Sequence, residues 1–128
     1  MINARSAILS GAILGCLAVL IGAFGAHGLK DYLAEVNRAA DYETAVRYQF
    51  YHAIALVLTG ILMMHATRST WLKVASICFL LGTVIFSGML YALVFSGITW
   101  LGAIVPIGGV LLVVGWIALG VSTRELER

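Results

Sequence analysis

Long runs without a charged side chain are the feature of this sequence that most restricts its fold. The longest run is the 50 residues 74–123, and two others cover residues 6–29 and 48–67. About 20 apolar residues are enough to cross a hydrocarbon core roughly 30 Å thick as a helix. Backbone polar groups in lipid need partners within the chain, and these runs lack the alternation of barrel strands. The sequence therefore predicts transmembrane helices.

The longest run must contain two helices. As one helix it would extend about 75 Å at roughly 1.5 Å per residue, far beyond the thickness of a bilayer. The polar, glycine-containing segment 96–99 lies near its middle and predicts a turn. The predicted fold class is therefore an all-α integral membrane protein, a single domain with four transmembrane helices in a bundle. The four spans are predicted at about residues 6–26, 46–66, 72–95 and 100–121.

The composition is typical of a membrane-embedded chain and excludes a nucleic-acid-binding one. Hydrophobic residues make up 62% of the 128 residues, and charged residues make up 11%. A soluble domain of this size would expose much of that apolar surface, at a cost of about 25 cal/mol per Å². The net charge of +2 is dispersed along the chain and forms no basic stripe for nucleic acid.

Basic residues at the ends of the spans predict the orientation of the chain. Four spans place both termini on the same side of the membrane. That side carries five basic residues and the opposite side carries three, which favours cytoplasmic N- and C-termini. The five are Arg5, Arg68, Lys73, Arg124 and Arg128, and the three are Lys30, Arg38 and Arg47.

The connection between the first two spans is expected to contain a short amphipathic surface helix. Apolar residues recur at helical spacing in segment 29–40, with charged residues between them. Such a segment lies flat on the membrane surface or caps the bundle. Asp41 is expected to cap the next helix, and Glu43 is expected to pair with Arg47 one turn later.

The first span presents small residues along one face. Small residues let two helix backbones approach closely in lipid, and residues 11–15 contain a GxxxG step. This helix-packing face contacts either another helix of the same chain or a second copy, and the sequence leaves both alternatives open. Its residues are Gly11, Gly15, Ala18, Gly22 and Ala26.

The only proline of the chain lies in the fourth span. Pro106 lacks an amide N–H, and its ring clashes with the carbonyl of Gly102, four residues earlier. We therefore expect a kink or a loosened turn at this point.

The two cysteines, Cys16 and Cys78, have neither metal-ligand nor redox spacing and are interpreted as small packing residues.

Four motifs resemble those of a known family. They are GAFGAHGLK at 22–30, TAVRYQFYHA at 44–53, FSGMLY at 86–91 and GAIVPIGG at 102–109. In this order and spacing, and over nearly the whole chain, the sequence resembles the small bacterial membrane-protein family catalogued as domain of unknown function 423. The resemblance implies a four-helix protein of the bacterial inner membrane. It implies no activity, so no catalytic residue is carried over.

Polar residues on all four spans are predicted to meet in the outer half of the bundle. Polar side chains within a membrane usually face the bundle interior and often mark function. The alternatives are a hydrogen-bonded cluster that fixes helix packing, with tyrosines as interfacial anchors, and a site for a ligand or ion. The residues of this predicted polar cluster are His27, Tyr48, Gln49, Tyr51, His52, Ser87, Tyr91 and Pro106.

No catalytic, metal or cofactor site is predicted. His27 and His52 supply two zinc ligands at most, without a cysteine or carboxylate at the same depth. The topology pairs no nucleophile with a histidine and a carboxylate. The glycines of segment 22–28 lie at the end of a membrane span rather than between a strand and a helix, so they do not form a phosphate loop.

Two classes of function fit the sequence. The first is a non-enzymatic structural, lipid-interacting or accessory component, with membrane lipids, a second copy of the chain or a larger membrane protein as its partners. The second is a small transporter or channel that uses the polar cluster as its site and Pro106 as a hinge. An enzyme is not expected, because no acid–base or nucleophile constellation is present.

Overall fold

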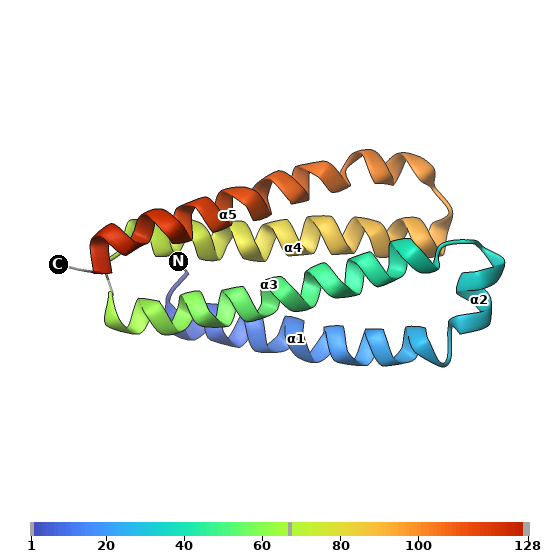
Figure 1. The fold of residues 1–128 in the computed structure, drawn as a ribbon, viewed down its shortest axis with the longest axis horizontal. Helices are drawn as coiled ribbons and strands as arrows, with labels where there is room; N and C mark the ends of the chain where they lie inside the picture. Colours follow the sequence, from blue (N-terminus) through green and yellow to red (C-terminus); the bar gives the residue numbers. More distant parts are fainter. Residues whose placement is uncertain (1, 67, 127–128) are drawn as a thin grey trace.

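A computed structural model describes residues 2–66 and 68–126 as a set of long α-helices (Figure 1). They are α1 (Ala4–Ala26), α2 (Lys30–Glu35), α3 (Ala39–His65), α4 (Thr70–Ser96) and α5 (Val105–Leu126), with the 3₁₀ turn η1 at Thr99–Ala103. Four segments are long and apolar enough to cross a membrane, and the described residues contain no strand. The predicted all-α fold, with four such helices and a short helix after the first, is confirmed.

The four long helices pack in the order α1, α3, α4, α5 (Figure 1). In their most apolar stretches, 44% of the residues of α3 and of α4 are buried, against 17% in α1 and 22% in the segment containing α5. The core therefore lies along the central pair, where Leu56, Leu72 and Phe79 are fully buried. The two edge helices turn most of their apolar surface outward.

The start of α1 and the end of α5 lie at one end of the molecule, and α2 lies at the other (Figure 1). We call the latter the α2 end.

Local sequence explains several helix boundaries. Asn3 and Ser6 form a reciprocal capping box at the start of α1, and the Ser69 hydroxyl accepts the Leu72 amide at the start of α4. Gly97 ends α4 in the left-handed conformation, with φ of 70°.

The amphipathic segment predicted at 29–40 is shorter as a helix than expected. α2 ends at Glu35 because Asn37 adopts the left-handed conformation, with φ of 53°. The amides of Asn37 and Arg38 then donate to the carbonyls of Ala34 and Leu33, which is a Schellman ending. Asparagine tolerates this conformation better than most residues, so a single side chain stops the helix.

The predicted start of the second long helix was also wrong. Asp41 is not its N-cap, because α3 begins at Ala39 and the Arg38 carbonyl accepts the first helical hydrogen bond, from Tyr42. Asp41 lies in the first turn and pairs with Arg38 at 2.9 Å. Among the described residues this is the only ion pair, so the expected pair between Glu43 and Arg47 is not formed.

The loosened turn expected near Pro106 is present, but the fourth helix does not continue through it. The chain instead forms η1, turns at Ile104 and starts α5 at Val105, so that Pro106 occupies the first helical turn. The first amides of a helix have no intrahelical partner, and proline is tolerated there without the loss of a hydrogen bond. The steric clash is relieved because the helix ends before the proline and begins again beside it.

Glycines allow close helix contacts on both sides of the central pair. A Cβ on Gly11 of α1 would lie 2.8 Å from the Ala53 carbonyl oxygen of α3. On the other side, a Cβ on Gly108 of α5 would lie 2.5 Å from the Phe86 backbone nitrogen of α4. Backbone-to-backbone contact of this kind stabilises helix pairs in lipid, where apolar burial cannot drive association.

Candidate functional site

The predicted polar cluster divides into residues that are joined by hydrogen bonds and residues that stand apart. His27, Tyr51 and Pro106 are exposed at separate places on the surface. Gln49, His52 and Ser87 are buried, and each has a hydrogen-bond partner. Tyr91 bonds to Gln49, and the Tyr48 ring is partly exposed and stacks on Phe86. The eight residues therefore do not surround one common cavity.

Gln49 joins three helices. Its side-chain amide donates to the Leu14 carbonyl of α1 at 2.9 Å, and its oxygen accepts the Tyr91 hydroxyl of α4 at 2.8 Å. The Gln49 side chain is 4% exposed, so both groups are removed from competing polar partners. Such bonds between helices act as polar links in an apolar environment. Gln49 therefore fixes the relative position of α1, α3 and α4.

His52 joins α3 to α5 through Trp116. His52 Nδ1 lies 2.7 Å from the Tyr48 carbonyl oxygen, and the Trp116 indole nitrogen lies 3.1 Å from His52 Nε2. A carbonyl only accepts and an indole N–H only donates, so the proton is on Nδ1 and Nε2 carries a lone pair. This arrangement requires the neutral imidazole.

The helix bounds show where His52 and Trp116 lie along their helices. Position 52 is the midpoint of α3, which starts seven residues before the predicted span at 46. Its partner Trp116 likewise lies near the midpoint of α5. His52 and Trp116 therefore meet near the midpoints of their two helices. An indole in the middle of an apolar span needs an acceptor for its N–H, and this was the signal that sequence reasoning missed.

Trp116→Phe is expected to lower the free energy of unfolding by about 1 kcal/mol, since it leaves His52 Nε2 without its donor. Thermal unfolding of the detergent-solubilised protein, followed by circular dichroism, measures this loss. Trp100→Phe is the control, because both indoles are exposed but that of Trp100, in η1, donates to no side chain or carbonyl among the described residues. Equal losses in the two variants would show that the indole bond contributes nothing.

Further tyrosine and serine hydroxyls connect the helices near the α2 end. The Tyr42 hydroxyl donates to the Ile21 carbonyl of α1 at 2.6 Å, and the Ser87 hydroxyl donates to the Ala45 carbonyl of α3 at 2.8 Å. The Tyr32 hydroxyl of α2 donates to the Val94 carbonyl of α4 at 3.3 Å. Tyr32 and Tyr42 were not singled out from the sequence, because they precede the span predicted to start at 46.

The helix-packing face of α1 lies mainly against α3. Gly11 faces Ala53 and Val57, Gly15 faces Ala53 and Gly22 faces Val46, while Ala18 is buried. Ala26 differs, because its side chain is exposed beside a pocket. Four of the five small residues therefore serve the α1–α3 contact within one chain.

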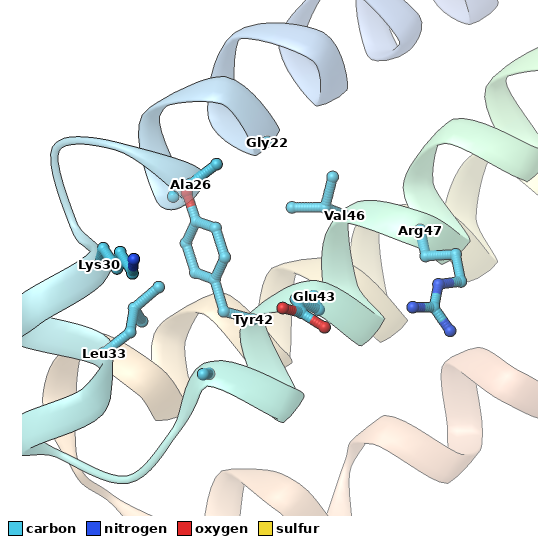
Figure 2. A pocket seen from close by; sticks show the side chains of 10 residues that line it. Gly22, Ala26, Lys30, Leu33, Tyr42, Glu43, Val46 and Arg47 are labelled. Carbon is cyan, nitrogen blue, oxygen red and sulfur yellow. The ribbon is translucent and has the colours of Figure 1, made fainter.

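A pocket of about 440 Å³ opens between α1, α2 and α3 at the α2 end; we call it the α1–α3 pocket. Figure 2 shows Tyr42 and Val46 pointing toward α1, with Lys30 on the α2 side and Arg47 farther along α3. Its lining is mostly apolar, and its charged residues are Lys30, Glu43 and Arg47. The full lining is Gly22, Gly25, Ala26, Lys30, Leu33, Ala39, Tyr42, Glu43, Val46 and Arg47.

Two glycines shape this pocket. A Cβ on Gly25 would overlap Tyr42 Cε1, so only glycine lets the ring lie against α1 and its hydroxyl reach Ile21. Gly22 leaves the recess above Val46, whose Cγ1 would be 3.1 Å from an added Cβ. The pocket therefore arises where small α1 residues meet Tyr42 and Val46 and where α2 bridges the two helix ends.

In the part of the chain that the structure describes, no three histidine, cysteine or acidic residues form a group able to hold a metal ion.

The chain is similar to known proteins over most of its length. The model of the family described as "Protein of unknown function (DUF423)" matches residues 21–109, which run from the end of α1 into the start of α5. A UPF0382 membrane protein of Staphylococcus haemolyticus is 42% identical over 116 residues, covering 91% of this chain and 93% of that protein. The UPF0382 membrane protein YwdK of Bacillus subtilis is 39% identical over 121 residues, covering 90% and 93%. No solved structure matches the chain.

The family match covers more than half of the chain, and it includes the α1–α3 pocket, Gln49, His52 and Tyr91. The relatives are aligned over nearly their whole length and are named as membrane proteins, in agreement with the four apolar helices. The resemblance recognised in the four sequence motifs is thereby confirmed. This chain is a membrane protein that belongs to the DUF423 family.

Proposed function

We propose that this protein is a non-enzymatic, lipid-interacting component of the bacterial cytoplasmic membrane that holds one lipid molecule in the α1–α3 pocket. The pocket is the observation that carries the proposal. It opens between helices that would lie within the bilayer, and most of its lining is apolar, as an acyl chain requires. Its charged residues stand where a lipid head group would meet the membrane surface.

The polar cluster supports a packing role rather than a transport site. The Gln49 amide nitrogen and oxygen and both His52 ring nitrogens are occupied by partners within the protein. A ligand or ion would have to break bonds that link α1, α4 and α5 to α3. Intramembrane polar groups with such mutual partners stabilise helix association. The small transporter or channel, with Pro106 as its hinge, is therefore the less supported alternative.

The proposed orientation places both termini in the cytoplasm and the α2 end at the opposite surface. The start of α1 and the end of α5 lie at the same end of the molecule (Figure 1). The excess of basic residues in the sequence is at this end, as expected for the cytoplasmic side. Reactivity of single-cysteine variants toward a membrane-impermeant reagent tests this arrangement. Lys30 at the α2 end and Arg5 at the other end provide suitable positions, once Cys16 and Cys78 are replaced with alanine.

Native mass spectrometry of the protein released from lipid nanodiscs tests the lipid site. We expect the wild type to retain one phospholipid, and Ala26→Phe to lose at least about 90% of it, because the ring fills the pocket beside Gly22. Ala23→Phe is the matched control, since Ala23 is also exposed at this end of α1 but does not line the pocket. A bare wild-type chain, or equal retention in all three proteins, would overturn the proposal.

The same spectra report on the other proposed partners. The edge helices α1 and α5 expose apolar faces that meet either lipid chains or another protein. Discrete masses of two or more chains would place a second copy at an edge. A single chain with one retained lipid would leave the surrounding bilayer as the partner of both edges.

A further inference from the structure

We infer that the α1–α3 pocket selects an anionic phospholipid, with Arg47 binding the phosphate and the acyl chain following the α1–α3 groove. This inference rests on the proposed lipid-binding function and adds the chemical class of the lipid and the residues that recognise it. It is carried by the charges around the pocket, by the position of Arg47 along α3 and by a second apolar hollow that continues in the same direction.

The Arg47 side chain can reach the depth of a lipid phosphate from a backbone position one turn inside the apolar span. Its neighbour Val46 faces Gly22, which lies one turn inside the end of α1 at Ala26. The Cα of Arg47 therefore lies about 6 Å inside the end of α1, and its long side chain is exposed at the pocket wall, from which it can extend back toward the membrane surface. An arginine at such a depth requires an anionic partner or water, and its planar fork matches phosphate oxygens.

Arg47 forms no ion pair with any of the described residues. Glu43 lies one helical turn away, but its carboxylate is not within ion-pair distance of the guanidinium. Figure 2 shows Glu43 between Tyr42 and Arg47, and Lys30 on the opposite side of the pocket. These three side chains give the pocket a formal charge of +1. The ammonium of a zwitterionic head group would be attracted by Glu43 and repelled by Lys30, so these two electrostatic interactions offset each other. A head group that carries only the phosphate charge is attracted by both cations, so the anionic lipid is favoured.

The apolar hollow below Arg47 fits an acyl chain. A groove of about 300 Å³ lies between α1 and α3, and its walls include Gly15, Val19, Phe50 and Leu58. On α3 the spacing from Arg47 through Phe50 to Leu58 keeps these residues on one helical face. The distance along the helix from 47 to 58 is about 16 Å, roughly the depth of one hydrocarbon leaflet. The pocket and the groove thus offer a head-group end and a chain end in one line.

Competition between lipids in mixed nanodiscs tests the inference. Nanodiscs of equal phosphatidylglycerol and phosphatidylcholine are used, and the lipid retained on the protein is identified by native mass spectrometry. We expect the wild type to retain phosphatidylglycerol over phosphatidylcholine by about tenfold, and Arg47→Gln to reduce this ratio to near one. Glu43→Gln is expected to raise the ratio, because it removes the only negative charge of the pocket. Arg68→Gln, at the far end of the molecule, is the control for general charge effects.

The outcomes separate the inference from the proposed function. If the wild type retains lipid and Ala26→Phe removes it, but Arg47→Gln keeps the tenfold ratio, the lipid site stands and the assignment of Arg47 is wrong. If the wild type retains both lipids equally, the anionic preference is wrong. If Arg68→Gln lowers the ratio as much as Arg47→Gln, the preference arises from overall charge and the pocket is not its source. Thermal unfolding of each variant is the control that tests whether its helices remain packed.

Discussion

Gly108→Val is expected to lower the free energy of unfolding by about 3 kcal/mol. An added Cβ would lie 2.5 Å from the Phe86 backbone nitrogen, 2.8 Å from its Cα and 2.9 Å from the Gly82 carbonyl oxygen. Backbone atoms cannot rotate away as a side chain can, so α5 must move off α4 as a whole. Overpacking of a close contact costs about 1–3 kcal/mol and occasionally more, and valine adds two further methyl groups. Thermal unfolding in detergent, followed by circular dichroism, provides the measurement.

The neighbouring glycine supplies the control. At Gly109 the nearest atoms to an added Cβ are ring carbons of Phe86 at 3.7 Å, which is ordinary van der Waals contact. Gly109→Val has the same effect on intrinsic helix propensity as Gly108→Val, so the difference between them measures the close approach alone. We expect Gly109→Val to change stability by less than about 1 kcal/mol. Similar losses at both positions would mean that α4 and α5 do not meet at Gly108.

Gln49→Leu is expected to lower the free energy of unfolding by about 2 kcal/mol. The substitution keeps most of the side-chain volume but removes the bonds to the Leu14 carbonyl and the Tyr91 hydroxyl. Each interhelical hydrogen bond in a membrane protein contributes about 0.6–2 kcal/mol. The Tyr91 hydroxyl is left without its acceptor, which adds a desolvation cost. Unfolding by increasing sodium dodecyl sulfate in mixed micelles measures the loss.

A double-mutant cycle isolates the bond between Gln49 and Tyr91. Tyr91→Phe removes the hydroxyl and leaves the aromatic contact with Tyr42, whose ring centre lies 5.7 Å away. Because both single variants break the same bond, the double variant should be more stable than the sum of the two losses predicts, by about 1 kcal/mol. Fully additive losses would show that the two side chains act independently.

The sequence was sufficient to predict the number of membrane-spanning helices, because the lengths of the uncharged runs determine it. A charged residue inside the hydrocarbon core is costly, and 50 uncharged residues cannot form one span, so the number of spans follows without any tertiary information. The small residues of α1 likewise predicted close helix packing. They did not show that α3 is the helix they contact, which depends on how the chain folds back after Asn37.

Helix ends and polar partners were predicted less well, because they depend on single residues and on distant ones. Asn37 ends α2 through a left-handed conformation that many sequences with asparagine do not adopt. The bond between Trp116 and His52 joins residues 64 positions apart, and it forms only in one register of α5 against α3. The α1–α3 pocket is a space between helices, and no local pattern in the sequence predicts such a space.

The order of the helices in the layer has a consequence for biosynthesis. Each long helix packs on the one that precedes it in the chain: α3 on α1, α4 on α3 and α5 on α4 (Figure 1). A span that leaves the ribosome therefore meets its partner already in the membrane, and the loop to be closed is short, so little entropy is lost. The protein can be assembled from the N-terminus by adding one helix at a time to the free edge, and a nascent chain that stops after α3 already contains a complete antiparallel pair.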